Sequence, residues 1–177
     1  VWQDLPSPNL PSGYEDYAKK NFEDESKRII TAFRNHPSII QWVVFNEGWG
    51  QFDTERMTQI VIGEVGQSLV CCASGWVDAP IGDIKDSHSY PNPSCPLDET
   101  RAGVCGEYGG ITLKVQGHIW PGGDFQYTTV ETGKDFTVLF NNLADKVIDH
   151  YYYGLNAAVY TQLSDVEIAK NGIYTYD

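Results

Sequence analysis

The sequence predicts an α/β fold organised around a mainly parallel β-sheet. Short apolar segments of strand length alternate with longer segments in which apolar residues recur at helical spacing. The connections between the expected strands are too long for hairpins, and parallel strands require such crossovers. We count about five parallel strands with flanking helices, preceded by a strand-like stub at residues 1–5.

The N-terminal half is expected to contain two helices and two of these strands. The proline-rich stretch LPSPNLPSG after the stub predicts a loop, and an amphipathic helix follows from Tyr14 to about Asn35. An apolar strand at 39–45 precedes a second helix at about 53–67, for which Asp53 is the expected N-cap. The next strand covers residues 69–73.

The C-terminal half is expected to supply three strands and one long helix. Short strands at 84–89 and 103–106 are separated by a proline-containing loop, a helix runs from about 129 to 153, and a last strand covers 156–162. A closed parallel barrel has eight strands and usually about 250 residues. With 177 residues, the chain is expected to be either an open sheet with its own architecture or part of a larger barrel.

The charge balance restricts the partners. The chain has 12 basic and 24 acidic residues, a formal net charge of −12 at pH 7. Nucleic acids and anionic membranes both require a positive face, so neither is an expected partner. No apolar run approaches the roughly 20 residues that span a bilayer, and the first residues do not resemble a signal peptide. A neutral substrate fits this charge balance better.

The four cysteines predict no metal site. No CxxC motif occurs among the cysteines, which are Cys71, Cys72, Cys95 and Cys105. We therefore expect neither zinc nor any other metal or cofactor. Three of them, Cys71, Cys72 and Cys105, lie in apolar strand-like segments, where a free thiol behaves as a small hydrophobic group. A short disulfide loop between Cys95 and Cys105 is the alternative.

Two glutamates at strand ends predict the functional site. Glu47 follows IIQWVVFN and Glu107 follows AGVCG, and each precedes a glycine-containing turn. Burying a carboxylate is unfavourable unless it is paired, so these positions indicate chemistry rather than stability. In a parallel barrel the C-terminal strand ends share one cleft, where two carboxylates can face each other as in a glycosidase. The alternative is a pair of buried structural carboxylates.

Four stretches carry a resemblance to the later strands of the catalytic barrel of glycoside hydrolase family 2, the family of β-galactosidases, β-glucuronidases and β-mannosidases. They are HPSIIQWVVFNEGWGQ, ASGWVDAPIGDIKDSHSYPNP, AGVCGEYGGITLKVQGHIW and AAVYTQLSDVEIAKNGIYTYD. The resemblance implies that residues 1–177 form one partial (β/α)8 TIM-barrel domain, from the end of strand 3 through strand 8. It also implies a retaining mechanism in which Glu47 is the general acid/base and Glu107 the nucleophile.

The resemblance further implies three polar residues that bind the sugar or the nucleophile. Asn46 is expected to hydrogen-bond a sugar hydroxyl beside the anomeric centre, and its alternative role is a strand-end cap. Tyr90 in SHSYP matches the tyrosine that contacts the nucleophile in the family. His88, at the same strand end, is assigned to the substrate site, with a satisfied core histidine as its alternative.

Aromatic residues in loops are the other substrate-binding candidates. Trp49, Trp76 and Trp120 follow strand ends in glycine-containing loops, where an indole can stack on a sugar or plug the loop against the core. Two further residues are weaker candidates of the same kind, His118 and Gln162. His36 precedes a proline at the entry to a strand and is expected to be structural.

One departure from the family narrows the expected substrate. Glucuronidase-like members read the substrate carboxylate with an N-x-K motif, but the comparable stretch of this chain has Ala169 and Asn171. The sequence therefore disfavours uronic acids, and we expect a retaining hydrolase of β-glycosides, with β-galactosides favoured. The alternatives are a non-catalytic fragment that binds carbohydrate weakly or serves only as a fold unit, and an unrelated parallel-sheet binding module.

The incomplete barrel also predicts self-association. A barrel that starts near its fourth strand exposes the edges of its first and last strands, together with apolar faces that missing helices would cover. Unpaired edges and apolar patches of this kind favour pairing with another chain. We therefore expect a homo-oligomer through exposed sheet edges.

Overall fold

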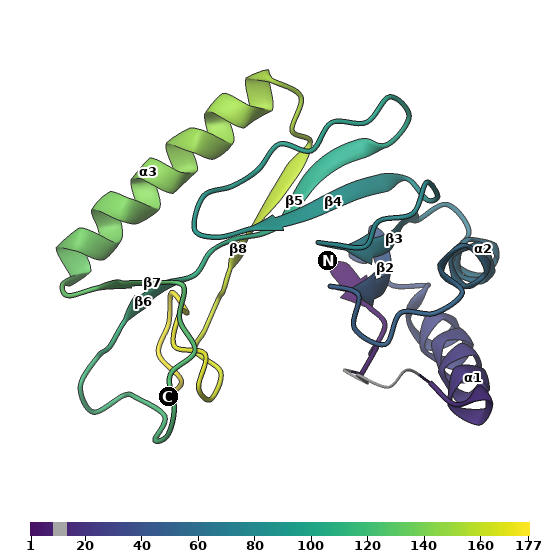
Figure 1. The fold of residues 1–177 in the computed structure, drawn as a ribbon, viewed down its shortest axis with the longest axis horizontal. Coiled ribbons are helices and arrows are strands. Elements are labelled where there is room, and N and C mark those ends of the chain that lie inside the picture. Colours follow the sequence, from purple (N-terminus) through teal and green to yellow (C-terminus); the bar gives the residue numbers. More distant parts are fainter. Residues whose placement is uncertain (9–13) are drawn as a thin grey trace. The chain divides into compact units, whose positions relative to one another are not determined.

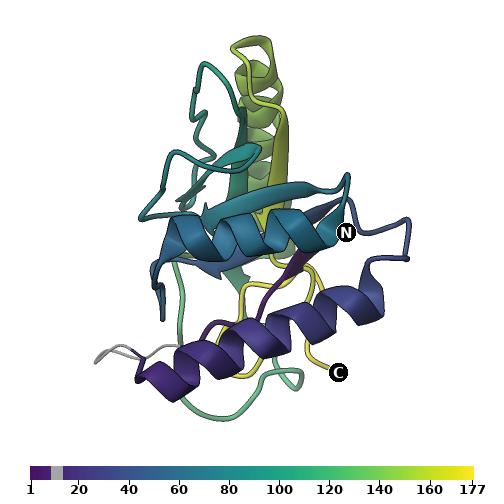
Figure 2. The same ribbon diagram turned by 90° about the vertical axis from the view of Figure 1, so that its right-hand side faces the viewer.

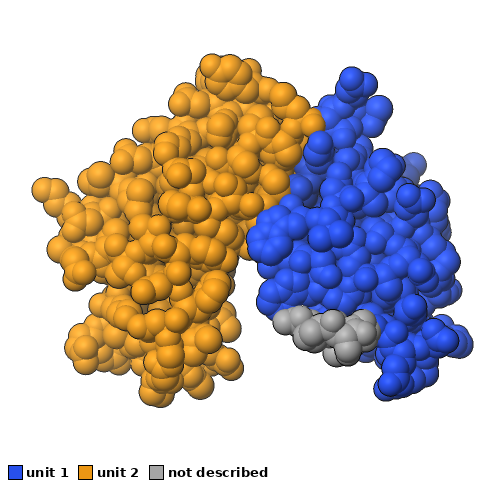
Figure 3. All heavy atoms as spheres, in the orientation of Figure 1, with its two compact units in different colours: residues 1–86, 98–102 blue, residues 87–97, 103–177 orange. Residues whose placement is uncertain are grey.

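A computed structural model describes residues 1–8 and 14–177, so residues 9–13 of the predicted proline-rich loop lie outside the described residues. The chain forms two compact units. Unit 1 contains residues 1–86 and 98–102, and unit 2 contains residues 87–97 and 103–177 (Figure 3).

The sheet contains six strands in the order β1-β2-β3-β4-β5-β8, in which β2 runs parallel to β1 and β3, β4 to β3, and β8 to β5. The expected count of about five was therefore one too low. The stub at the start of the chain is a true strand, β1 (Trp2–Asp4), which pairs with β2 (Gln41–Asn46). Three residues were too few for an alternating pattern to stand out in the sequence, and the hydrogen bonds of the neighbouring strand stabilise β1.

Unit 1 packs two helices on one face of its strands. Helices α1 (Asp16–Phe33) and α2 (Thr54–Val65) lie side by side against the strands β1, β2 and β3 (Leu69–Ser74), as Figure 2 shows. Every residue of β2 from Gln41 to Phe45 is buried, which is typical of a parallel strand covered on both faces. The expected helices and strands of this half are thus present.

Aromatic residues form the centre of the unit 1 core. The Phe22 ring of α1 stacks on Phe45 of β2 with ring centroids 5.5 Å apart, and Phe52 contacts both rings edge-on. Along α1, Phe22, Ser26 and Ile30 are buried at a spacing of four residues, which gives the helix one inward face. Asp53 occupies the N-cap position of α2 as expected, although its side chain makes no capping hydrogen bond.

A returning segment of the chain closes unit 1. Arg101 donates hydrogen bonds to both carboxylate oxygens of Asp78 and also to Asp98. It further donates to the carbonyl oxygens of Ala79 and Ile84, and its side chain is only 8% exposed. Residues 98–102 are therefore held to unit 1 by one nearly buried guanidinium group.

Unit 2 contains the end of β4 (Ile84–Ser89), nearly all of β5 (Ala102–Gly109), and β8 (Ala157–Thr161), with α3 (Gly133–Tyr152) packed beside them (Figure 1). Its core is small, because Leu143 is the only buried residue of α3. Leu143 packs in a cluster with the buried residues Cys105, Tyr108, Ile111 and Leu155.

Unit 2 differs from expectation after the strand that carries Glu107. β5 continues to Gly109, and a separate parallel pair forms from β6 (Ile111–Leu113) and β7 (Thr128–Val130). The predicted helix at 129–153 therefore starts too early. Thr132 is the N-cap of α3, and its hydroxyl oxygen accepts a hydrogen bond from the Asp135 N–H at 3.1 Å, so capping chemistry sets the helix start.

Candidate active site

The first candidate glutamate lies in a sharp turn at the end of β2. Glu47 has a φ of 53°, which is uncommon for a residue with a side chain, and Gly48 after it has a φ of 75°. The Glu47 N–H donates to the Ser74 carbonyl oxygen at 2.9 Å, and Trp49 N–H donates to the Asn46 carbonyl oxygen at 3.0 Å. Residues held in such backbone conformations cluster at functional sites, and Glu47 is half-buried there beside Asn46.

Buried polar residues beside this turn escaped the sequence analysis. Ser74, at the end of β3, donates a 2.5 Å hydrogen bond from its hydroxyl to the Asp86 carboxylate, and both residues are buried. The signal for Asp86 was available, because Ile84, Asp86 and His88 alternate along β4 and are buried on one face. A buried aspartate two residues before a candidate site histidine belongs to the same strand face.

The second glutamate meets two other predicted site residues. The Tyr90 hydroxyl donates a short hydrogen bond to Oε2 of Glu107, and His88 Nδ1 lies 3.6 Å from the same oxygen. The His88 side chain is fully buried, whereas the Glu107 side chain is 31% exposed. One carboxylate oxygen is thus held by groups from the end of β4, while the side chain keeps access to solvent.

The hydroxyl of Tyr90 stays a donor over a wide pH range. Burial raises the pKa of Tyr90 far above its ordinary value, and the hydrogen bond to Glu107 raises it further. The protonated hydroxyl therefore persists as the hydrogen-bond donor to Glu107.

A bulge aims Glu107 away from the regular strand. Cys105 pairs with Ala158 of β8, and Tyr108 pairs with Tyr160, so β5 has one more residue than β8 between these two positions. Bulges re-aim side chains and are frequent next to active sites. The Cys105 thiol lies 3.4 Å from the Glu107 carbonyl oxygen, and Tyr160 of β8 packs edge-on against Tyr108 of β5.

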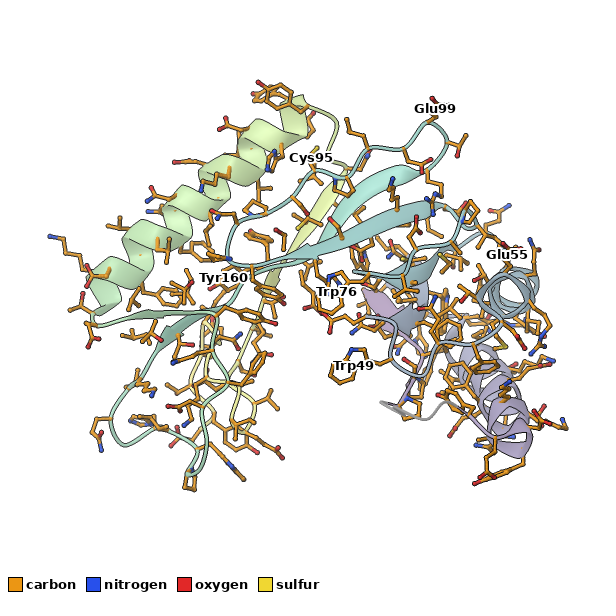
Figure 4. The ribbon with its side chains drawn as sticks, in the orientation of Figure 1. Trp49, Glu55, Trp76, Cys95, Glu99 and Tyr160 are labelled. Carbon is orange, nitrogen blue, oxygen red and sulfur yellow. The ribbon has the colours of Figure 1, made fainter. Side chains whose placement is uncertain are left out.

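The three loop tryptophans differ in their surroundings. Trp49 and Trp76 are each about half exposed, at 47% and 51%, and project from the loops after β2 and β3 (Figure 4). Trp120 instead contacts Tyr176, with ring centroids 4.9 Å apart. Trp49 and Trp76 are therefore partly exposed to solvent, and Trp120 is partly used in a contact within unit 2.

The weaker candidates take part in contacts within their units. His118 Nδ1 lies 2.9 Å from the Asp177 carboxylate, and Gln162 donates to the Ala169 carbonyl oxygen at 3.2 Å. His36 contacts the ring of Phe33, as expected for a structural residue. None of these contacts involves Glu107.

The cysteines are free thiols, and Cys71, Cys72 and Cys105 are buried. The alternative disulfide between Cys95 and Cys105 is therefore not formed. Burial raises the pKa of the Cys71 thiol well above its ordinary value, so it is an unreactive core group.

The predicted site residues are thus distributed over both units. Unit 2 brings His88, Tyr90 and Glu107 together, and unit 1 holds Asn46 and Glu47 at the end of β2. The approach of the two glutamates to each other stays a prediction.

No family model matches the sequence, and no curated protein matches it significantly. Among the described residues, none of the helices combines the length and hydropathy that a bilayer crossing requires.

Proposed function

We propose that the chain is the catalytic part of a retaining glycoside hydrolase that acts on β-glycosides, with β-galactosides favoured. The observation that carries this proposal is the Glu107 carboxylate at a bulged strand end, which accepts a hydrogen bond from the Tyr90 hydroxyl and lies 3.6 Å from Nδ1 of the buried His88. A nucleophilic carboxylate must be ionised, oriented and accessible. The Tyr90 hydrogen bond orients the Glu107 carboxylate, and its 31% exposure leaves it accessible, which supports this proposal.

In the proposed mechanism the two glutamates share the work. Glu107 attacks the anomeric carbon and forms a glycosyl-enzyme, while Glu47 protonates the oxygen of the leaving group. Glu47 then removes a proton from water, which releases the sugar with retained configuration. Asn46 beside Glu47 is placed to hydrogen-bond a neighbouring sugar hydroxyl, and Trp49 and Trp76 offer ring faces for stacking.

We further propose that the six-stranded parallel sheet belongs to a (β/α)8 barrel and that the chain forms a homo-oligomer. The support is the strand order, which leaves β1 and β8 at the two ends of the sheet. Unpaired strand edges are sites of association with a second chain. Light scattering at micromolar concentration tests this, and a stable monomer would contradict it.

Turnover of an aryl β-galactoside tests the proposed activity. The wild-type chain should release the aryl group, and Glu47→Gln and Glu107→Gln should each strongly reduce turnover of substrates with poor leaving groups. Inactivity of the wild-type chain over a panel of aryl β-glycosides would favour the non-catalytic alternative instead.

A crystal structure gives an independent test of the mechanism. A retaining enzyme requires about 5–5.5 Å between the two carboxyl groups. A separation beyond about 9.5 Å would overturn the paired-carboxylate mechanism, because neither retention nor inversion operates at that distance.

A further inference from the structure

The loop at 114–127, between β6 and β7, holds an aromatic ring against the hydrogen-bond donor of Glu107. The ring of Tyr127 lies parallel to the ring of Tyr90, with centroids 3.7 Å apart and planes within 3°. The Phe125 ring packs edge-on against the Tyr127 ring, with the two centroids 5.1 Å apart. The orientation of the Tyr90 ring determines where its hydroxyl points.

The stacking geometry indicates that the loop, rather than ring attraction, fixes this pair. Aromatic rings prefer offset or edge-to-face arrangements with centroids 4.5–7 Å apart. A parallel pair closer than this range is less favourable than an offset pair, so other contacts must help to hold the rings in place. The segment 124–128 has such contacts at both ends.

Two sets of contacts pin the segment. At its start, the Phe125 N–H donates to the Ile168 carbonyl oxygen at 2.9 Å, and the Lys170 ammonium donates to Oδ1 of Asp124 at 2.6 Å. At its end, the Thr128 N–H donates to the Gly110 carbonyl oxygen at 3.3 Å. The Lys170 side chain is only 6% exposed, so this ion pair is shielded from solvent on one side.

Gly110 provides the space for the stacked rings. A Cβ atom at this position would lie 2.4 Å from Cδ2 of Tyr127 and 3.0 Å from Cδ1 of Tyr90, and the φ of 66° also favours glycine. The backbone that follows the nucleophile strand thus accommodates both rings.

We propose that Tyr127 is a positioning residue: its ring fixes Tyr90 in the orientation that donates to Glu107, and the Lys170–Asp124 ion pair holds the loop in place. The consequence for catalysis rests on the proposed function. The ring contact itself does not, so it can be tested without turnover.

The activity test compares a ring deletion with a ring-preserving change. Tyr127→Leu should lower kcat for an aryl β-galactoside by about tenfold to a hundredfold with little change in KM, because the nucleophile is bound but misplaced. Tyr127→Phe keeps the stack and should stay near wild type. The matched control is Tyr151→Leu, since Tyr151 is 67% exposed and its ring packs edge-on against Tyr152, away from Glu107. Equal effects of Tyr127→Leu and Tyr151→Leu would overturn the proposal.

A second pair of variants tests the anchor without touching the rings. Lys170 and Lys114 both bind Asp124, but Lys114 belongs to the same loop as Asp124 and is 40% exposed. Lys170→Met should reproduce the loss of kcat seen with Tyr127→Leu, and Lys114→Met should leave it nearly unchanged. The reverse order would contradict the assigned anchor.

Nuclear magnetic resonance of the chain labelled with 13C at the tyrosine Cζ separates this proposal from the proposed function. The Tyr90 signal is assigned with Tyr90→Phe. Glu107→Gln should shift this signal in the wild-type background and leave it nearly unshifted in the Tyr127→Leu background, where the hydrogen bond is already lost. Equal shifts in both backgrounds would overturn the positioning role, whether or not the chain hydrolyses glycosides.

Discussion

Unit 1 and unit 2 differ in the kinds of side-chain contact that dominate them. Unit 1 buries two helices against its strands and centres its core on stacked phenylalanine rings. Unit 2 buries a single residue of its helix and devotes long irregular segments to polar and aromatic contacts around Glu107. The comparison teaches that the stacked aromatic core of this chain and the contacts around Glu107 lie in different units.

The largest expected effect distinguishes the two glutamates, one from each unit. Glu47→Gln should slow substrates with poor leaving groups by about 10²- to 10⁴-fold, because the general acid is lost. Activated aryl leaving groups need no proton and should restore much of the rate of the first step. Glu107→Gln should show no such rescue. The comparison between the glutamates fails if Glu47→Gln hydrolyses poor-leaving-group substrates at the wild-type rate, as measured by initial-rate kinetics.

The two cores should differ in their response to cavities. Phe45→Ala in unit 1 should cost about 3–5 kcal/mol, because it removes a ring that is stacked on Phe22. Leu143→Ala in unit 2 should cost about 2–5 kcal/mol. Hydrogen exchange should assign each loss to the amides of its own unit. A uniform loss of protection over both units would instead show that the chain unfolds as one cooperative body.

Tyr90→Phe should produce a smaller change confined to unit 2. It removes one hydrogen bond to a charged group, which contributes about 1.5–3 kcal/mol, and leaves the ring that stacks on Tyr127. The rate of glycoside hydrolysis should fall by roughly tenfold to a hundredfold. Its thermal unfolding temperature should fall by roughly 3–12 °C, the shift that this loss of stability produces in a chain of this size. A rate equal to wild type would remove the hydrogen bond from the proposed mechanism.

The smallest effect is an acid-dependent one in unit 1. Hydrogen bonds from Arg56 and Lys27 lower the pKa of Glu23 from its ordinary value near 4.5 to about 2. Because the folded pKa is the lower one, the ion pairs stabilise the fold above about pH 4.5, and this contribution is lost as the pH falls through about 2. Glu23→Gln should therefore lower stability by less than about 1 kcal/mol at pH 7 and by only a small fraction of that at pH 2. Denaturation at both pH values measures the difference, and a constant difference would contradict the assignment.

Much of the fold could be predicted because its signals are local. The apolar run in β2 and the amphipathic spacing of α1 identify those elements without any tertiary information. β1, β6 and β7 have three residues each, and their strand conformation depends on pairing with partners distant in sequence. Short strands of this kind leave no periodic pattern.

Part of the candidate site could also be predicted from the sequence. Strand-end position and neighbouring glycines indicated Glu107, and the resemblance linked it to Tyr90. Tyr127 could not be found in this way, because its role comes from a loop that folds back through contacts at Asp124 and Phe125. A half-exposed tyrosine in a glycine-rich loop has no sequence signature that separates it from any other surface tyrosine.

The return of residues 98–102 to unit 1 has a consequence for how the chain is made. The polypeptide emerges from the ribosome with its N-terminus first, so the helices and first strands of unit 1 emerge well before Arg101 does. Until then Asp78 lacks the guanidinium group that binds it, and the carbonyl groups of Ala79 and Ile84 lack one of their donors. The packing of the nascent unit 1 therefore remains incomplete while residues 87–97 of the other unit are synthesised. Final closure of the first half is coupled to translation of the second.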